Sequence, residues 1–198
     1  MKTLDLSHVV VTSVTRDDLD DGGADLFVQT IEEIRKTSPI CTIEVLTPDF
    51  NGDIASLQNI LDAVPDVFNH NIEVVNDLFS TIRPDGNYQR SISLLRYAKD
   101  YKPEIITKSG FMVGLGETKD QIYQLLFDLN NASVDILTIG QYLQPSKHHL
   151  PVKRYYTPEE FDTLKDQAVL MGFSHVESGP LVRSSYHAEQ ALRHIRCL

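Results

Sequence analysis

The sequence predicts an α/β fold in which crossover helices join the strands of a parallel β-sheet. Short β-branched runs alternate with segments of helical periodicity along the whole chain. One strand and one helix together take roughly 30 residues, which is long enough for a parallel crossover. The 198 residues include no low-complexity tract and no linker, and a chain of this length can bury one substantial core. We therefore expect a single domain over residues 1–198.

The strands are predicted from short runs rich in valine, isoleucine and threonine. In chain order they are His8–Val14, Thr42–Leu46, Asp66–Asn69, Ile105–Thr107 and Asp135–Ile139, with a sixth around His175–Glu177. Because the first strand begins so early, it leaves an exposed sheet edge unless another part of the molecule covers it. The fold looks as though it begins one βα unit late.

The helices are predicted from apolar residues that recur on one face with helical spacing. These segments are Ala24–Lys36, Ile54–Ala63, Tyr88–Lys99 and Lys119–Asn131. Thr118 and Gln121 form a capping-box pattern at the start of the fourth segment. A further helix start is marked by Thr157 followed by Pro158, and a last helix follows the polar stretch "RSSYHAE".

Composition excludes several classes of partner. The chain has 18 basic and 28 acidic residues and a net charge of −10, so it has no general attraction to nucleic acid or to an anionic membrane. An acidic partner would need a local basic patch. The N-terminus resembles neither a signal peptide nor a membrane span, and the two cysteines cannot form a disulfide framework. We expect a cytoplasmic protein.

Polar residues follow each of the first five predicted strands. Since chemistry in βα folds lies beyond the carboxyl ends of the strands, these residues predict one shared pocket. They are Thr12, Ser13, Arg16, Asp17, Thr47, Asp49, Asn69, His70, Asn71, Glu73, Lys108, Ser109, Gly110, Gly140, Gln141 and Tyr142. The alternative is that these are ordinary polar turns. The amide, guanidinium and lysine groups exceed what turns require, so a pocket is favoured.

Three motifs allow both a functional and a structural interpretation. In "VFNHNIEVV", a carboxylate beside an asparagine can hold a ribose diol, or the segment is an Asx-turn. In "SGFMVGLGET", the glycines either bind a ligand or turn the chain into a helix. In "RSSYHAE", Arg183 and a serine face the pocket, or Ser184 or Ser185 caps the last helix.

Two other features concern a nucleophile and a metal. Lys108, at the predicted end of a strand, is either a Schiff-base nucleophile or, more commonly, an ion-pair partner or an anion binder. The adjacent His148 and His149 lack the spacing of a zinc site.

Six segments, taken together and in order, closely resemble lipoyl synthases of the radical S-adenosylmethionine (SAM) superfamily. The segments are "TSVTRDDLDDGGA", "VLTPDF", "FNHNIEVV", "TKSGFMVGLGET", "DILTIGQYLQPSKHHLPV" and "SGPLVRSSYHAE". The resemblance implies a partial TIM-like (β/α) barrel of about five to six parallel strands with the first βα unit missing. It also implies a C-terminal extension over about 145–198.

The resemblance implies the insertion of two sulfur atoms at C6 and C8 of a protein-bound octanoyl chain. The family uses SAM and two [4Fe–4S] clusters, one of which cleaves SAM while the other donates sulfur. The implied partners are an octanoylated carrier domain, from a 2-oxoacid dehydrogenase E2 component or the glycine-cleavage H protein, and an electron donor such as ferredoxin or flavodoxin.

The resemblance also implies roles for particular residues. Ser185, the second serine of the "RSSY" motif, would ligate an iron of the auxiliary cluster. A serine oxygen suits iron in a sulfide cluster less well than a thiolate does, which fits an iron that must leave. The residues that would contact SAM are Asn69, Asn71, Glu73, Gly114, Gly116 and Glu117. No catalytic residue is assigned.

Departures from the family pattern limit what we expect of this chain. Neither of the family's two cysteine triads is present, and Cys41 and Cys197 match no cluster position. Val74 stands where the pattern leads us to expect threonine. We interpret the chain as a truncated, split or internally started lipoyl synthase that performs no radical chemistry alone. The alternatives are a non-catalytic fragment that docks a carrier or complements another half, and a Schiff-base lyase that uses Lys108.

Overall fold

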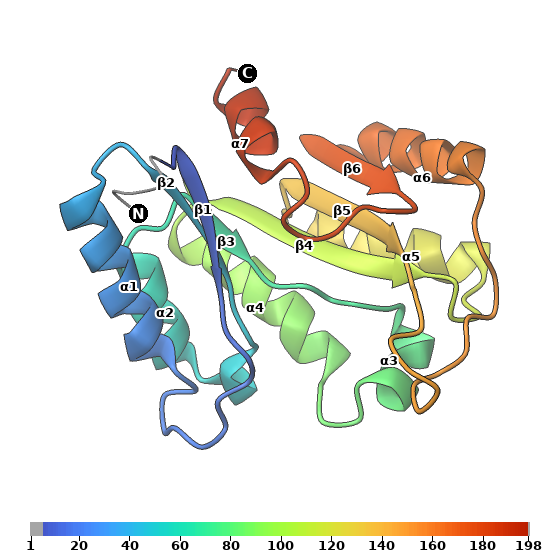
Figure 1. The fold of residues 1–198 in the computed structure, drawn as a ribbon, viewed down its shortest axis with the longest axis horizontal. Helices are drawn as coiled ribbons and strands as arrows, with labels where there is room; N and C mark the ends of the chain where they lie inside the picture. The colour runs from blue at the N-terminus through green and yellow to red at the C-terminus, as the bar shows by residue number, and fades with distance from the viewer. Residues whose placement is uncertain (1–5, 198) are drawn as a thin grey trace.

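A computed structural model describes residues 6–197, in which six parallel strands form one open sheet in chain order (Figure 1). The strands are β1 (His8–Thr12), β2 (Thr42–Leu46), β3 (Val67–Asn69), β4 (Ile106–Val113), β5 (Ile136–Gln141) and β6 (His175–Gly179). Each strand pairs in parallel with the next. This arrangement confirms the predicted α/β fold and is consistent with a partial TIM-like barrel.

Helices α1 to α6 connect successive strands and pack on one face of the sheet, while α7 follows the last strand (Figure 1). They are α1 (Ala24–Thr37), α2 (Ile54–Asp62), α3 (Asn76–Ile82), α4 (Tyr88–Tyr101), α5 (Lys119–Asn131), α6 (Pro158–Met171) and α7 (Ala188–Arg196), with a short 3-10 helix, η1 (Phe50–Gly52). The capping box predicted at Thr118 is formed, and Thr157, predicted as a helix start before Pro158, forms a second capping box with Glu160. None of the helices in residues 6–197 has the length and apolar character to cross a membrane.

The structure corrects the predicted strand ends. β4 and β5 each run beyond their predicted ends, so Lys108 and Gly140 lie within strands rather than after them. Lys108 is compatible with a strand because its side chain is buried in an ion pair with Glu44. Gly140 is compatible with a strand because a loop approaches it closely. α3 was not predicted, since seven residues are too few to show a helical period.

A buried ion pair lies on the sheet face opposite to the main helices. Lys108 Nζ donates to both carboxylate oxygens of Glu44, at 2.9 and 3.0 Å, and each side chain is 1% exposed. Asn69 Nδ2 donates to the same carboxylate at 2.7 Å. This contact joins β2, β3 and β4. Lys108 is thus an ion-pair partner, and a nucleophilic lysine would need an amine that a substrate can reach.

The last helix, α7, occupies the opening between the two edges of the sheet (Figure 1). On the β1 side, Ser7 Oγ donates to Glu189 Oε1 at 2.7 Å. On the β6 side, His187 Nδ1 lies 3.6 Å from Glu177 Oε1. The apolar face of α7 is buried, with Leu192 2% exposed. The helix thus covers part of the opening that the early first strand led us to expect.

Replacing Lys108 with alanine should lower the free energy of unfolding by about 3–5 kcal/mol, because it leaves the Glu44 carboxylate buried without its counter-charge. Urea denaturation at neutral pH measures this loss. The exposed Lys36 is a matched control, and Lys36→Ala should change the stability by no more than about 0.5 kcal/mol. Equal losses of unfolding free energy in the two variants would contradict a buried ion pair between Lys108 and Glu44.

Candidate functional site

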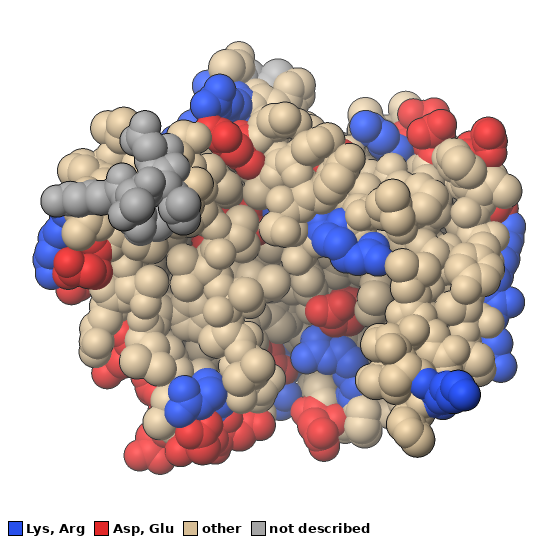
Figure 2. Space-filling model, viewed as in Figure 1, with Lys and Arg blue, Asp and Glu red and all other residues tan. Residues whose placement is uncertain are grey.

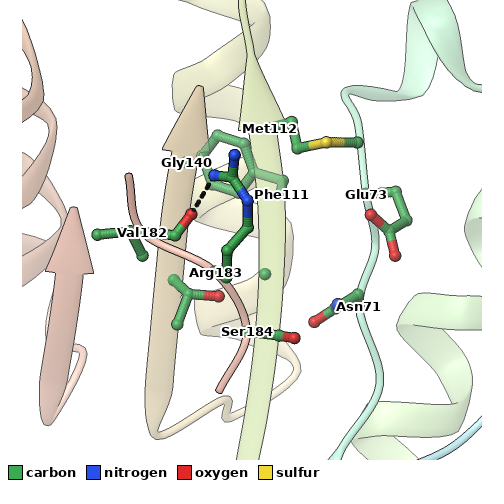
Figure 3. Close-up of a pocket in the computed structure, with 10 residues that line it drawn as sticks. Asn71, Glu73, Phe111, Met112, Gly140, Val182, Arg183 and Ser184 are labelled. Carbon is green, nitrogen blue, oxygen red and sulfur yellow. Dashed lines mark hydrogen bonds between the residues drawn. The ribbon is translucent and has the colours of Figure 1, made fainter. Parts of the chain in front are cut away.

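Two adjoining cavities lie at the carboxyl ends of the strands and share Asn71 and Glu73. The first has a volume of about 210 Å³ and the second of about 250 Å³. The first is lined by Asn71, Glu73, Gly110, Phe111, Met112, Thr138, Gly140, Val182, Arg183 and Ser184 (Figure 3). The second is lined by Thr12, Ser13, Thr15, Leu46, Thr47, Pro48, His70, Asn71, Glu73 and Arg83. Half of the strand-end residues named from the sequence therefore converge, and they do so around two cavities rather than one shared pocket.

The segment after β3 carries the two shared residues. Glu73 has a backbone φ of 71°, which is uncommon for a residue other than glycine. Its N–H donates to the carbonyl of Gly110 at 3.0 Å, and its carbonyl accepts from the N–H of Met112 at 2.8 Å. These two bonds hold the segment against β4. Figure 3 shows Asn71 and Glu73 on one side of the cavity, with Ser184 and Arg183 on the other.

The Glu73 carboxyl is the titratable group of this segment. Burial raises its pKa above the ordinary 4.5, while the positive charge of Arg83 and a hydrogen bond from Asn71 oppose the shift. The Asn71 side-chain oxygen is buried and has no hydrogen-bond partner among the described residues. The cavity therefore offers an unused amide acceptor next to a carboxyl group.

Two glycines allow the cavity wall to form. A side chain at Gly110 would collide with the Thr138 hydroxyl on the neighbouring strand, and a Cβ at Gly140 would lie 2.5 Å from the carbonyl oxygen of Val182. A backbone oxygen cannot turn aside as a flexible side chain can. Gly140 is therefore required for the close approach of the C-terminal segment to β5.

His70 fixes the start of the segment that carries Asn71. It is 2% exposed, with Nδ1 2.9 Å from the Thr47 carbonyl oxygen and Nε2 2.9 Å from the Ser91 hydroxyl. A carbonyl can only accept, so Nδ1 carries the proton and Nε2 accepts from Ser91. Burial lowers the pKa of His70 below 6.5, although the bond to Thr47 opposes the shift. The neutral ring thus ties β2, β3 and α4 together.

The C-terminal segment "RSSY" reaches the first cavity through Arg183 and Ser184. Ser185 is exposed and is not among the residues that line either cavity. The alternative that Ser184 or Ser185 caps the last helix is wrong. The N-cap of α7 is His187, in a left-handed conformation with no side-chain cap bond.

The other expected SAM-contacting residues lie outside the two cavities. Asn69 is fully buried against Glu44. Gly114 and Gly116 adopt positive φ in a turn at the end of β4. Glu117 closes this turn, because its carboxylate accepts from the N–H groups of Gly114 and Leu115 at 2.6 and 2.9 Å.

Three of the strand-end residues form other contacts instead of lining the two cavities. Arg16 pairs with Asp18 at 2.7 Å, Asp17 accepts from Asn51, and Asp49 pairs with Arg90 at 2.6 Å. Sequence reasoning missed Arg83, Thr138 and Met112. Arg83 follows the unpredicted α3, and Met112 lies in the part of β4 that was expected to be loop. Thr138 lies within the predicted fifth strand, where only the residues after the strand were considered for the site.

The side chains present do not fit an iron–sulfur cluster. Within residues 6–197, no group of three or more His, Cys, Asp or Glu side chains is placed to hold a metal ion. Cys41 is buried beside β2, and Cys197 is exposed beyond α7. Neither cysteine lines either of the two cavities, and Ser185 does not line them either.

The stability of the protein should fall as the pH decreases from about 7 to 5, in part because of His70. Unfolded His70 binds a proton below 6.5 while the buried native ring does not, so stability is lost there by up to about 1.4 kcal/mol per pH unit. His70→Gln should show a shallower dependence in urea denaturation. The exposed His148→Gln is the control and should follow the original protein. Parallel curves for both variants would contradict a buried neutral ring.

Comparison with known proteins gives the family. The family model of the radical SAM superfamily matches residues 1–129. A lipoyl synthase from Rubrobacter xylanophilus is 56% identical over 190 residues, with 96% of this chain and 59% of the relative covered. A lipoyl synthase from Dichelobacter nodosus is 58% identical over 190 residues, with 95% of this chain and 59% of the relative covered. The chain therefore spans about three fifths of the length of these relatives.

Solved structures agree in fold. A methylornithine synthase superposes with a TM-score of 0.63 at 13% identity, covering 96% of this chain and 67% of that one. A 2,3-dimethylmalate lyase gives a TM-score of 0.50 at 12% identity, and the match covers 98% of this chain and 72% of that one. The predicted resemblance to lipoyl synthases is confirmed by the high identity of those relatives. Because the family model matches residues 1–129, this chain belongs to the radical SAM superfamily.

Proposed function

We propose that this chain is the part of a lipoyl synthase that binds SAM and faces the acyl substrate. The enzyme as a whole would insert two sulfur atoms at C6 and C8 of a protein-bound octanoyl chain. The observation that carries the proposal is the unpartnered, buried Asn71 oxygen beside Glu73, in a cavity at the carboxyl ends of the strands. The 56% identity to a lipoyl synthase over 190 residues supports the same function.

The residues of the first cavity fit a nucleoside ligand such as SAM. Asn71 and Glu73 together supply acceptors for the two hydroxyl donors of a ribose. Bound SAM, when reduced by one electron from a [4Fe–4S] cluster, would release methionine and supply a 5′-deoxyadenosyl radical for hydrogen abstraction. The chain's own residues would bind and orient the ligand, with Arg83 facing the Glu73 carboxyl and Gly110 leaving room beside Asn71. Contacts from Asn69, Gly114, Gly116 and Glu117 remain predictions.

Iron–sulfur cluster chemistry needs more cysteine ligands than the two in this chain. The whole enzyme would hold the two [4Fe–4S] clusters of the family, and Ser185 would ligate the auxiliary cluster only together with cysteines from outside this chain, because Cys41 and Cys197 cannot anchor a cluster together. We therefore propose that the chain performs no radical chemistry by itself. The carrier domain, the electron donor, the cytoplasmic location and a single domain with an extension from about residue 145 are also proposals.

Binding of S-adenosylhomocysteine, a stable analogue of SAM, tests this function without a cluster. Asn71→Ala and Glu73→Gln should each weaken binding by about 10-fold, because the first removes a hydrogen bond to a ribose hydroxyl and the second replaces a carboxylate acceptor with a weaker amide acceptor. Equilibrium dialysis or calorimetry measures the change. Asp62→Asn, on the exposed end of α2, is a matched change of carboxylate to amide and should leave the affinity unchanged. Equal affinity in all four proteins would refute the proposed site.

A further inference from the structure

The connection between β5 and α6, residues 142–157, differs in charge from the rest of the protein. This segment, which we name the basic loop, contains Lys147, Lys153 and Arg154 together with His148 and His149, and it has no acidic residue. The chain as a whole has a net charge of −10. The basic loop is thus the local basic patch that an acidic partner requires.

The basic loop is ordered although it contains no helix or strand. Tyr142 donates its hydroxyl hydrogen to the Leu150 carbonyl at 2.8 Å, and Gln144 Nε2 donates to the His149 carbonyl at 2.8 Å. The N–H of Lys153 donates to the Gly114 carbonyl at 2.8 Å, which fixes the loop to the end of β4. Long irregular loops that are held in one conformation are commonly functional.

The charged groups of the basic loop are available to a partner. Lys147 and Lys153 are exposed and pair with no acidic side chain among residues 6–197, whereas Arg154 pairs with Glu160. Apolar surface lies in the same loop, since Leu150 is 41% exposed and Tyr155 is 68% exposed. Exposed lysines beside apolar and aromatic surface suit a protein–protein contact.

The loop lies at the end of the sheet where the cavities open. It leaves the carboxyl end of β5, which contributes Gly140 to the first cavity. On the other side of this end, the β1–α1 loop carries acidic residues, namely Asp17, Asp18, Asp20 and Asp21. Figure 2 shows acidic side chains gathered at the lower left and basic side chains along the lower right. An acidic partner would be repelled on one side of the cavities and attracted on the other.

We propose that the basic loop docks an acidic protein domain that presents its acyl chain to the cavities. This inference rests on the proposed function, and it adds the surface and the charge of the partner. Nucleic acid carries phosphates along its whole length and would also meet the aspartates of the β1–α1 loop, whereas an acidic patch on a protein domain can contact the basic loop alone. Lys147 and Lys153 steer and hold the acidic surface, and Tyr155 packs against it.

The experiment measures binding of the 198-residue chain to two probes by biolayer interferometry. One probe is an octanoylated carrier domain with an acidic surface, and the other is a short octanoyl-lysine peptide without the domain. The double variant Lys147→Glu/Lys153→Glu should bind the domain at least ~10-fold more weakly at low salt, mainly through a slower association rate. The difference should shrink as salt screens the charges. Peptide binding should not change.

Matched variants control for net charge and for folding. Lys36→Glu/Lys165→Glu alters charge equally at exposed positions outside the basic loop, and it should bind the domain like the original protein. Lys147→Ala/Lys153→Ala, which introduces no repulsion, should show a smaller loss in the same direction.

Three results would overturn the inference. Unchanged domain binding in both lysine variants, with intact peptide binding, would refute the docking surface and leave the proposed function standing. Absence of binding to either probe by the original protein would refute both. Competition by duplex DNA that matches the carrier domain would show a general polyanion site instead.

Discussion

The functional geometry of this protein depends on one constraint, the parallel order of its six strands. In a sheet whose strands all run parallel, the carboxyl ends of the strands lie at the same end of the sheet. Residues that are far apart in sequence therefore meet there. Asn71 and Ser184 are more than a hundred residues apart, yet both line the first cavity. Each cavity takes its lining from the carboxyl ends of more than one strand.

The interior face of the sheet supports this arrangement through charge rather than through apolar packing. The pair of Lys108 and Glu44 links β4 to β2 across β3, and Asn69 completes the contact. A buried pair of this kind adds little net stability over well-packed apolar residues, but removing one partner is costly. In this protein the pair fixes the position of β4, and β4 in turn carries Gly110 and holds Glu73 in place.

Much of the fold could be predicted because local patterns and tertiary structure agree. β2 was predicted with the observed ends, and the capping boxes at Thr118 and Thr157 mark real helix starts. The ends of β4 and β5 could not be predicted, since Lys108 and Gly140 look like loop residues unless their cross-strand partners are known.

The site was predicted less completely than the fold. Asn71 and Glu73 follow a predicted strand and could be found by position, whereas Arg83 lies beyond a helix too short to predict. No sequence pattern distinguishes Ser184, which lines the cavity, from Ser185, which is exposed. That difference depends on how the segment passes β5 at Gly140.

The central claim is that a single ligand site is built from the strand ends and the C-terminal segment together. Hydrogen exchange measured with and without S-adenosylhomocysteine tests it directly. The account predicts slower exchange on ligand binding in two segments distant in sequence, residues 70–73 and 182–184. Protection in only one of these two segments, or in neither, would contradict it.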